Sequence, residues 1–527
     1  MRLWRNVCVA LLVLVAACAR MPEDAPAQVS ELKPAGCVTQ GPANAAANHD
    51  AVAALLAASS ECPSNVLEFR GRLEREPAKV ATAFVDNRGF HNGVAGSFSL
   101  FESVTGVVAG VPVAPGDFFF GHFTDKRGTE LVLAQTPEDK ALLIELIAWD
   151  PAKGLFNFYE LRGDGTRGQW FYRGDSADIL RDIAPLHRQD DPEHPVFGQR
   201  LRCSGCHLGG GPIMKELEAP HNDWWTMARP LPLAGLTPEP ALARILGQGL
   251  GDAERLAMRV RQGNARLEAS VAFRAARKGR TRQERLRPLF CPEEMNLASD
   301  AMPNEARAAV KAPSAFFVDP RLASRELVVS RPSYDAALRA LKSAFPESGQ
   351  PDGDHAWLGP VKAAADVAAV AALVREHAVD EEFVADVLAV DMGNPALSSA
   401  RCGLLRLVPE DAHGWVAAFV RALAASKEPA ARELHANLTE PARHAAWHRA
   451  QAAAMLEACS RRLQAGEITP YVELLAQRRA EVFANEISKN PRGQILEPGF
   501  RVIFPDVTPE PRPGALTLTR DCTIVRP

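Results

Sequence analysis

The residues best suited to chemistry lie in one short motif, Cys203-Ser204-Gly205-Cys206-His207. Its two thiols are three positions apart, so one helical turn projects both of them, and each can form a thioether with a vinyl group of haem. The adjacent His207 can then reach the iron as an axial ligand. The composition of the chain predicts only about 0.005 chance occurrences of this C-x-x-C-H spacing, so we interpret the motif as a covalent haem site.

Two other kinds of site use paired cysteines, and neither fits this context. A thioredoxin-like redox pair would lie in a βαβ pattern, whereas this motif is followed by the glycine-rich stretch Leu208-Gly209-Gly210-Gly211-Pro212. A structural zinc site would need a second ligand pair at regular spacing, which the sequence lacks. Covalent haem attachment is therefore the interpretation that the motif favours.

Through this motif the sequence resembles the c-type cytochromes, over roughly a hundred residues. The resemblance implies one covalently bound haem c in a mainly helical region, with Cys203 and Cys206 as the thioether attachment points and His207 as the axial ligand. In many small cytochromes a proline carbonyl further along the chain accepts a hydrogen bond from that imidazole. Pro212 stands closer to the motif than in that pattern.

The second iron ligand has several candidates. Met302 precedes Pro303 in a loop-like stretch, and this pair resembles the distal loop of class I cytochromes, so we expect Met302 to be the metal ligand opposite His207. Met258 has a more ordinary separation from the motif, but its helical spacing predicts a core methionine. The alternatives are Met258, His221 and an open position, which would favour ligand or peroxide chemistry over electron transfer.

Other residues near the motif could line a haem pocket. The segment His221-Asn222-Asp223-Trp224-Trp225 could form one wall. Arginines could pair with the haem propionates, and the candidates are Arg200, Arg202 and Arg229. The run from Arg274 to Arg287 is strongly basic; such a run is usually a solvated helix face, although beside a haem it could steer an acidic redox partner.

The first twenty residues predict export. Arg2 and Arg5 precede an apolar run from Val7 to Ala17, whose length of about eleven residues is too short for the roughly 20 that span a bilayer. The run ends in Val15-Ala16-Ala17-Cys18, which resembles the lipobox of bacterial lipoproteins, so Cys18 is expected to carry a lipid that anchors the protein to a membrane. The same resemblance, with Ala19 next, implies the outer membrane, with the protein facing the periplasm. Covalent haem attachment also takes place outside the cytosol, so the two motifs agree.

The other cysteines are consistent with an oxidising compartment. The chain has ten cysteines, and setting aside Cys8, Cys18 and the two in the haem motif leaves an even number for disulfides. These are Cys37, Cys62, Cys291, Cys402, Cys459 and Cys522. Sequence leaves fifteen possible connectivities open, and the pair closest in sequence, Cys37 with Cys62, is the easiest to form. Any single pair could instead be buried thiols.

We expect an α+β fold, with an antiparallel β-rich domain followed by a mainly α-helical cytochrome c-like haem region and further helices. The expected segments are a signal peptide at 1–17, an Ala/Pro-rich tether at 18–62, the β-rich domain at 63–176, the haem region at 177–310, a helical domain at 311–500 and a strand-like tail at 501–527.

Local patterns locate some of the elements. Five runs read as strands, and turn residues between the last three predict consecutive hairpins; the runs are Asp117–Gly121, Glu130–Leu133, Leu142–Trp149, Leu155–Glu160 and Gln169–Tyr172. A helix is expected over Ala177–Ile183. Apolar residues at helical spacing predict core stripes at Val367, Val370 and Val374, at Trp415, Phe419 and Leu423, and at Leu475 and Val482.

Composition restricts the function. The 527 residues are 47% hydrophobic and carry a formal net charge of -4, which suits folded domains and disfavours nucleic acid as a partner. The leading hypothesis is a lipid-anchored protein that transfers single electrons at the cell envelope to a redox partner that the sequence does not identify. One alternative is a haem enzyme, a peroxidase or oxygenase, with an open sixth coordination site. Another is an envelope binding protein with a structural or sensory haem.

Overall fold

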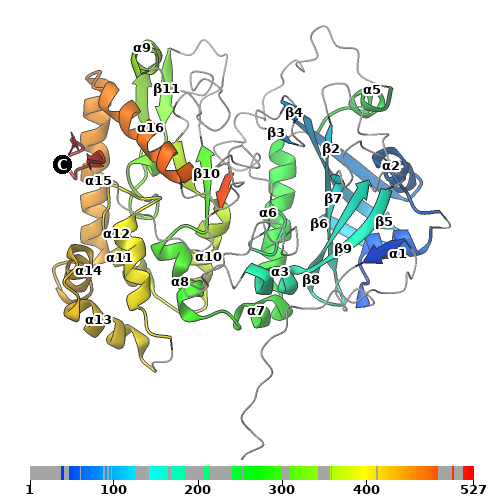
Figure 1. Cartoon of the computed structure of the whole chain (residues 1–527), viewed down its shortest axis with the longest axis horizontal. Coiled ribbons are helices and arrows are strands. Elements are labelled where there is room, and N and C mark those ends of the chain that lie inside the picture. The colour runs from blue at the N-terminus through cyan, green and yellow to red at the C-terminus, as the bar shows by residue number, and fades with distance from the viewer. Residues whose placement is uncertain are drawn as a thin grey trace, which may run out of the picture.

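The computed structural model of the chain divides into two halves (Figure 1). It describes residues 37–40, 47–59, 61–86, 90–91, 94–95, 98–124, 142–163, 168–183, 203, 207, 209–213, 240–251, 253–298, 308–341, 357, 359–410, 413–484, 501–503 and 514–526. One half is built on a large sheet and the other is mainly helical. The coarse α+β prediction is therefore confirmed.

A seven-stranded sheet forms the N-terminal half, in the order β1-β9-β8-β7-β6-β5-β2. Its strands are β1 (Val38–Gln40), β2 (Ala78–Asp86), β5 (Phe98–Val108), β6 (Val111–Thr124), β7 (Leu142–Asp150), β8 (Leu155–Gly163) and β9 (Gly168–Asp175). Every pair is antiparallel except β1 with β9, which are parallel. The predicted hairpins from β7 to β9 are confirmed. A small hairpin of β3 (Phe90–His91) and β4 (Val94–Ala95) is separate from this sheet.

Helices cover both faces of the sheet. One face packs against α1 (Ala51–Ala57), α2 (Val66–Leu73) and α5 (Pro240–Gly247), and the opposite face packs against α3 (Ser176–Ile183), α6 (Ala253–Ala269) and α7 (Val271–Arg277). Because side chains alternate along a strand, Phe118 and Phe120 of β6 enter the first core and Phe119 enters the second. The predicted helix from Ala177 to Ile183 is α3.

The predicted tether at 18–62 needs correction, because part of it is folded. Strand β1 joins the edge of the sheet, and α1 packs on its face with Val52 fully buried. Asp50 caps α1 by accepting hydrogen bonds from the backbone N–H groups of Val52 and Ala53. The alanine-rich composition that suggested a tether here supports a helix, since alanine is the best helix former. Residues 18–36 lie outside the described residues.

The C-terminal half is mainly helical and has a core of its own. Its longer helices are α8 (Arg282–Phe290), α9 (Arg331–Leu341), α10 (Ala364–Arg375), α11 (Glu381–Leu388), α13 (Trp415–Ala425), α14 (Pro429–Thr439), α15 (Ala445–Gln464) and α16 (Thr469–Ala484). The shorter helices are α12 (Ser399–Gly403), η6 (Ser314–Phe316) and η8 (Leu404–Leu407). Phe290 of α8 packs on Phe383 and Phe419, so this half begins at α8, inside the segment assigned to the haem region.

Three small sheets complete this half. They are β13 (Gly359–Lys362), β10 (Glu294–Ala298) and β14 (Arg501–Ile503); β11 (Ala309–Ala312) with β12 (Leu327–Ser330); and β15 (Thr517–Leu518) with β16 (Ile524–Val525). The strand character of the tail is thus confirmed at β14 and β15. In the part of the chain that the structure describes, no helix has both the length and the apolar character to cross a membrane.

The six cysteines other than Cys8, Cys18, Cys203 and Cys206 form three disulfides. The pairs are Cys37–Cys62, Cys291–Cys402 and Cys459–Cys522, with Cα–Cα distances of 5.3, 4.7 and 5.1 Å. The first lies in the sheet half and the other two lie in the helical half. Disulfide pairing of these six cysteines, and of Cys37 with Cys62 in particular, is therefore confirmed.

Candidate functional site

The first and last residues of the motif are joined by one helical turn. The backbone N–H of His207 donates to the carbonyl of Cys203 at 2.8 Å, which is the four-residue spacing of an α-helix. Cys203 packs on the core between the sheet and α6. This agrees with the expectation that a single turn carries the motif, while Cys206 lies outside the described residues.

The imidazole of His207 has a defined tautomer. Its Nδ1 lies 2.7 Å from the carbonyl oxygen of Gly211, and a carbonyl can only accept, so Nδ1 carries the proton. The lone pair is then on Nε2, which is the arrangement typical of a metal-ligating histidine held by a backbone carbonyl. The ring also packs edge-on against Phe158 of β8, with centroids 5.1 Å apart. Gly211, and not Pro212, supplies the carbonyl.

The loop after His207 is shaped by two glycines and by α6. Gly210 has φ +70°, and its N–H donates to the carbonyl of His207 at 2.7 Å. A Cβ on Gly211 would collide with the side chain of Asn264 on α6. The Asn264 amide in turn donates to the carbonyl of Pro212 at 2.9 Å. These contacts fix the direction in which the imidazole points.

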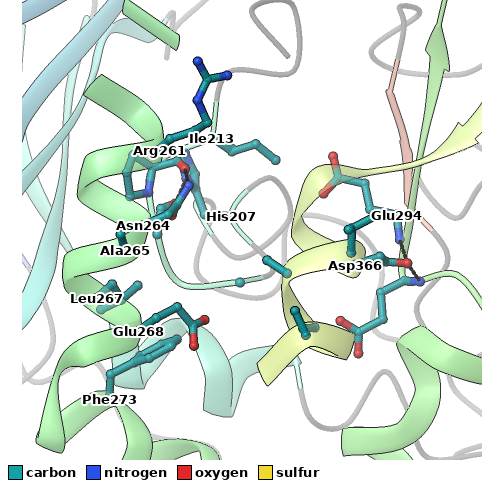
Figure 2. A pocket seen from close by; sticks show the side chains of 18 of the residues that line it. His207, Ile213, Arg261, Asn264, Ala265, Leu267, Glu268, Phe273, Glu294 and Asp366 are labelled. Carbon is teal, nitrogen blue, oxygen red and sulfur yellow. Dashed lines mark hydrogen bonds between the residues drawn. The ribbon is translucent and has the colours of Figure 1, made fainter. Parts of the chain in front are cut away.

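His207 lines a cavity of about 920 Å³ between the two halves of the molecule. Figure 2 shows His207 and Asn264 on the α6 side and Asp366 and Glu294 on the opposite side. The wall formed by α10 carries small side chains, Ala368, Ala369 and Ala371. Val367 on the same helix is 43% exposed and lines the cavity, so its predicted place in a core stripe is wrong, although Val370 is buried. Helical spacing identifies an apolar face but not what the face contacts.

The cavity is rich in charge. Six basic and four acidic side chains line it: Arg261, Arg274, Arg277, Arg280, Lys362, Arg375, Glu268, Glu293, Glu294 and Asp366. Three of the arginines belong to the basic run, which is therefore not simply a solvated helix face. Arg277 pairs with Glu268 at 2.6 Å, and Arg375 reaches the same carboxylate at 3.6 Å from the other half.

Arg280 is a cavity-lining basic group that has unused hydrogen-bonding capacity among the described residues. Its side chain is 12% exposed and pairs with Glu293 at 3.6 Å. Its Nε and Nη2 atoms are buried and find no hydrogen-bond partner among the described residues. Because a buried guanidinium is costly without acceptors, Arg280 is suited to receive an anion in the cavity.

The wall opposite His207 contains an acidic cluster of Glu293, Glu294 and Asp366. Asp366 is only 2% exposed and accepts hydrogen bonds from the backbone N–H groups of Glu293, at 2.7 Å, and Glu294, at 3.3 Å. Burial, reinforced by the charge of Glu293, raises the pKa of Asp366 well above its usual value. Lys362 is beside the cluster, and burial with the charges of Arg321 and Arg401 lowers its pKa to about 7.

Several predicted site residues belong to segments that the structure does not describe. They are Cys18, Cys206, His221, Trp224, Trp225 and Met302, together with the propionate candidates Arg200, Arg202 and Arg229. Met258 is 47% exposed on α6 and does not line the cavity, so the prediction of a core methionine is wrong. Asn264, Arg280, Lys362 and Asp366 were not predicted, since they are distant in sequence from the motif and only the fold brings them together.

The residues present fit a haem. The cavity volume is within the roughly 300 to 1,000 Å³ of cofactor sites. The His207 ring lines the cavity and is held by a backbone carbonyl, as metal-ligating histidines are, and the formal excess of two positive charges matches two propionates. That excess is unchanged if Asp366 and Lys362 are both neutral. In the described segments no group of three or more His, Cys, Asp or Glu residues is arranged to hold a bare metal ion. No known protein family, curated protein or solved structure matches the chain.

Proposed function

We propose that this protein is an exported lipoprotein that binds one haem c covalently and transfers single electrons at the cell envelope. The observation that carries the proposal is the hydrogen bond from His207 Nδ1 to the Gly211 carbonyl in a ring that lines a large cavity, an arrangement typical of metal-ligating histidines. The C-x-x-C-H spacing supplies the second, independent support.

The chain offers a place for each part of the cofactor. Cys203 and Cys206 would form the thioethers, and His207 would be the proximal ligand. Arg280, whose Nε and Nη2 have no hydrogen-bond partner in the described part of the chain, would pair with a propionate. Met302 remains the proposed distal ligand. When bound, the haem supplies an iron that gains and loses one electron.

The protein's own contribution is to position and shield that group. The Gly211 carbonyl and Phe158 hold the imidazole ring, and Asn264 fixes the loop that carries the carbonyl. A site held rigid in both oxidation states reduces the reorganisation that accompanies electron transfer, because its dipoles need not move. The alanines of α10 give the cavity a wall of small apolar side chains that leaves space for the haem.

Export and anchoring are supported by separate features. The leader ending in Val15-Ala16-Ala17-Cys18 would place a lipid on Cys18 and hold the domains at the periplasmic face, with the outer membrane as the implied destination. Three disulfides suit an oxidising compartment. The partner would be another one-electron carrier.

The test is haem staining of the denatured protein after expression with a cytochrome maturation system. Wild type is expected to stain for haem, and its absorption spectrum should change reversibly on one-electron reduction and oxidation. Cys203→Ala/Cys206→Ala is expected to lose the stain. The matched control, Cys459→Ala/Cys522→Ala, also removes two cysteines, but these form a disulfide in the helical half, and the variant should keep the stain. Colourless wild-type protein would overturn the proposal.

The spectrum also separates electron transfer from enzymatic chemistry. A low-spin spectrum in both oxidation states, unchanged by carbon monoxide or peroxide, supports a carrier with two axial ligands. Loss of low-spin character in Met302→Ala would identify the distal ligand. A spectrum that responds to peroxide would instead indicate the haem enzyme with an open coordination position.

A further inference from the structure

The imidazole of His207 contacts the large sheet through an aromatic side chain. Its ring centroid lies 5.1 Å from that of Phe158, which is 1% exposed on β8. Two residues earlier on the same strand, Phe156 is 0% exposed and belongs to the same core as Phe158. Because side chains two positions apart on a strand lie on one face, the two phenylalanines follow one another along that face of β8.

A tryptophan extends this row to the neighbouring strand. Trp149 of β7 lies opposite Phe156 in the register of the sheet, and their ring centroids are 5.2 Å apart. The indole is half-buried, whereas Phe156 is fully buried. Strand β7 ends at the next residue, and Ala152 in the turn that follows is exposed. The row of rings therefore runs from His207 to a side chain that reaches the surface.

The indole of Trp149 is held in place by a charged pair. The guanidinium of Arg266, on α6, lies over the ring at 5.9 Å from its centroid, a distance typical of a cation–π contact. Arg266 also forms an ion pair with Asp117 of β6, and its own side chain is partly exposed. The positive charge thus stays beside the indole at the surface end of the row.

We propose that Trp149, Phe156 and Phe158 form the route by which an electron passes between a carrier at the surface and the haem bound at His207. This inference rests on the proposed function. A reduced one-electron carrier contacts the surface at Trp149 and is oxidised, and its electron reduces the haem iron. No bond forms or breaks, and no proton moves. Oxidation of the haem uses the same route in the opposite direction.

The physical reason is that electron tunnelling weakens steeply across empty space, whereas atoms in contact carry the electronic coupling. Each step of the route is such a connection: the His207 ring against Phe158, the backbone of β8 between the two phenylalanines, and Phe156 against the indole. The route lies in a buried core, where close packing leaves few gaps. None of its three residues lines the charged cavity, so the route leaves the haem through its axial ligand.

The experiment measures electron transfer within the haem-loaded full chain, between the haem and a ruthenium polypyridyl label on Ala152→Cys. After a flash changes the oxidation state of the label, the absorption of the haem gives the transfer rate. Trp149→Leu and Phe158→Leu, each made in the labelled protein, should slow the transfer several-fold, because each removes one ring contact of the route.

Phe119→Leu is the matched control. Phe119 is also 1% exposed in the same core, but among the described residues it makes no ring contact with His207 or Trp149. This variant loses the same number of atoms from the core as Phe158→Leu and should leave the transfer rate unchanged. A slowing caused by loosened packing alone would appear in Phe119→Leu as well, and would overturn the inference.

A second measurement needs no haem. In the labelled Cys203→Ala/Cys206→Ala protein, the flash-oxidised label should take one electron from the indole of Trp149, so that the absorption of a tryptophan radical appears. Trp149→Phe keeps an aromatic ring in the core but should lose this signal, whereas Phe119→Leu should keep it.

The outcomes separate the two proposals. A transfer rate that Trp149→Leu and Phe158→Leu both leave unchanged would overturn the inference while leaving haem binding intact. A tryptophan radical that persists in Trp149→Phe would show that Trp149 is not the surface end of the route. Absence of haem from the wild-type protein would overturn the proposed function itself.

Discussion

The side-chain amide of Asn264 donates to the carbonyl of Pro212 at 2.9 Å and thereby ties the loop that orients His207 to the middle of α6. Asn264→Ala leaves this carbonyl without its donor and should lower the free energy of unfolding by about 1 kcal/mol. If the proposed haem is bound, its absorption spectrum should broaden as the imidazole becomes less constrained. Thermal unfolding and the absorption spectrum measure both effects.

Asn437 provides the control for that substitution. Its side-chain amide also donates to a buried carbonyl, that of Asp386 at 3.0 Å, but in the helical half. Asn437→Ala should destabilise the protein by a similar amount without any change in the spectrum. Equal spectra for both variants would show that Asn264 has no role at the site.

Two neighbouring glycines should respond differently to the same substitution. Gly210 has φ +70°, and a Cβ there would lie 3.0 Å from the carbonyl of Ser176, so Gly210→Ala should cost about 1 kcal/mol or more. Gly209 has open space around its Cα, so Gly209→Ala should be close to neutral. Chemical denaturation of both variants tests this, and a neutral Gly210→Ala would contradict the loop conformation.

The effect of Arg280→Met should depend on whether haem is bound. In the haem-free Cys203→Ala/Cys206→Ala background, the change removes two buried nitrogens that lack hydrogen-bond partners among the described residues, but it also breaks the Arg280–Glu293 ion pair. These effects oppose each other, so the net change in unfolding free energy should be small. In the haem-loaded protein the same change should destabilise, by roughly 1.5 to 3 kcal/mol for a lost charged hydrogen bond. The unfolding free energies of the protein with Arg280 and of Arg280→Met, each with and without haem, give the coupling energy between Arg280 and the haem. A coupling energy of zero would argue against a propionate at Arg280.

The disulfides should contribute unequally to stability. Chain-entropy arguments give roughly 5 kcal/mol for the Cys291–Cys402 bond, which closes 111 residues, and roughly 3.5 kcal/mol for Cys37–Cys62, which closes 25. Cys291→Ala/Cys402→Ala should therefore unfold at a lower urea concentration than Cys37→Ala/Cys62→Ala. The reverse order would show that packing dominates over chain entropy at these positions.

Local patterns predicted the parts of the site that are local in sequence. The turn from Cys203 to His207 and the hairpins from β7 to β9 follow from spacing and turn residues alone. Spacing alone did not predict that the carbonyl of Gly211, and not that of Pro212, accepts the hydrogen bond from His207. This depends on how Asn264 holds the loop.

Longer-range features were beyond sequence patterns. Asp366 and Arg280 meet His207 around one cavity only because α10 and the turn after α7 pack toward α6, and no periodicity encodes that. Val367 shows the same limit, since its spacing matches a buried stripe while its side chain faces open space. Composition was misleading at α1, where alanines that resemble a linker form a capped helix.

The cavity lies where two separately stabilised bodies meet. Each disulfide closes within one half, and among the described segments the chain passes between the halves at residues 278–281, from α7 to α8. A cofactor bonded to Cys203 in the sheet half would be enclosed on its other side, by α10, only when the helical half packs against the sheet half. Docking, more than the folding of either body, would then determine how far bulk water can reach the metal.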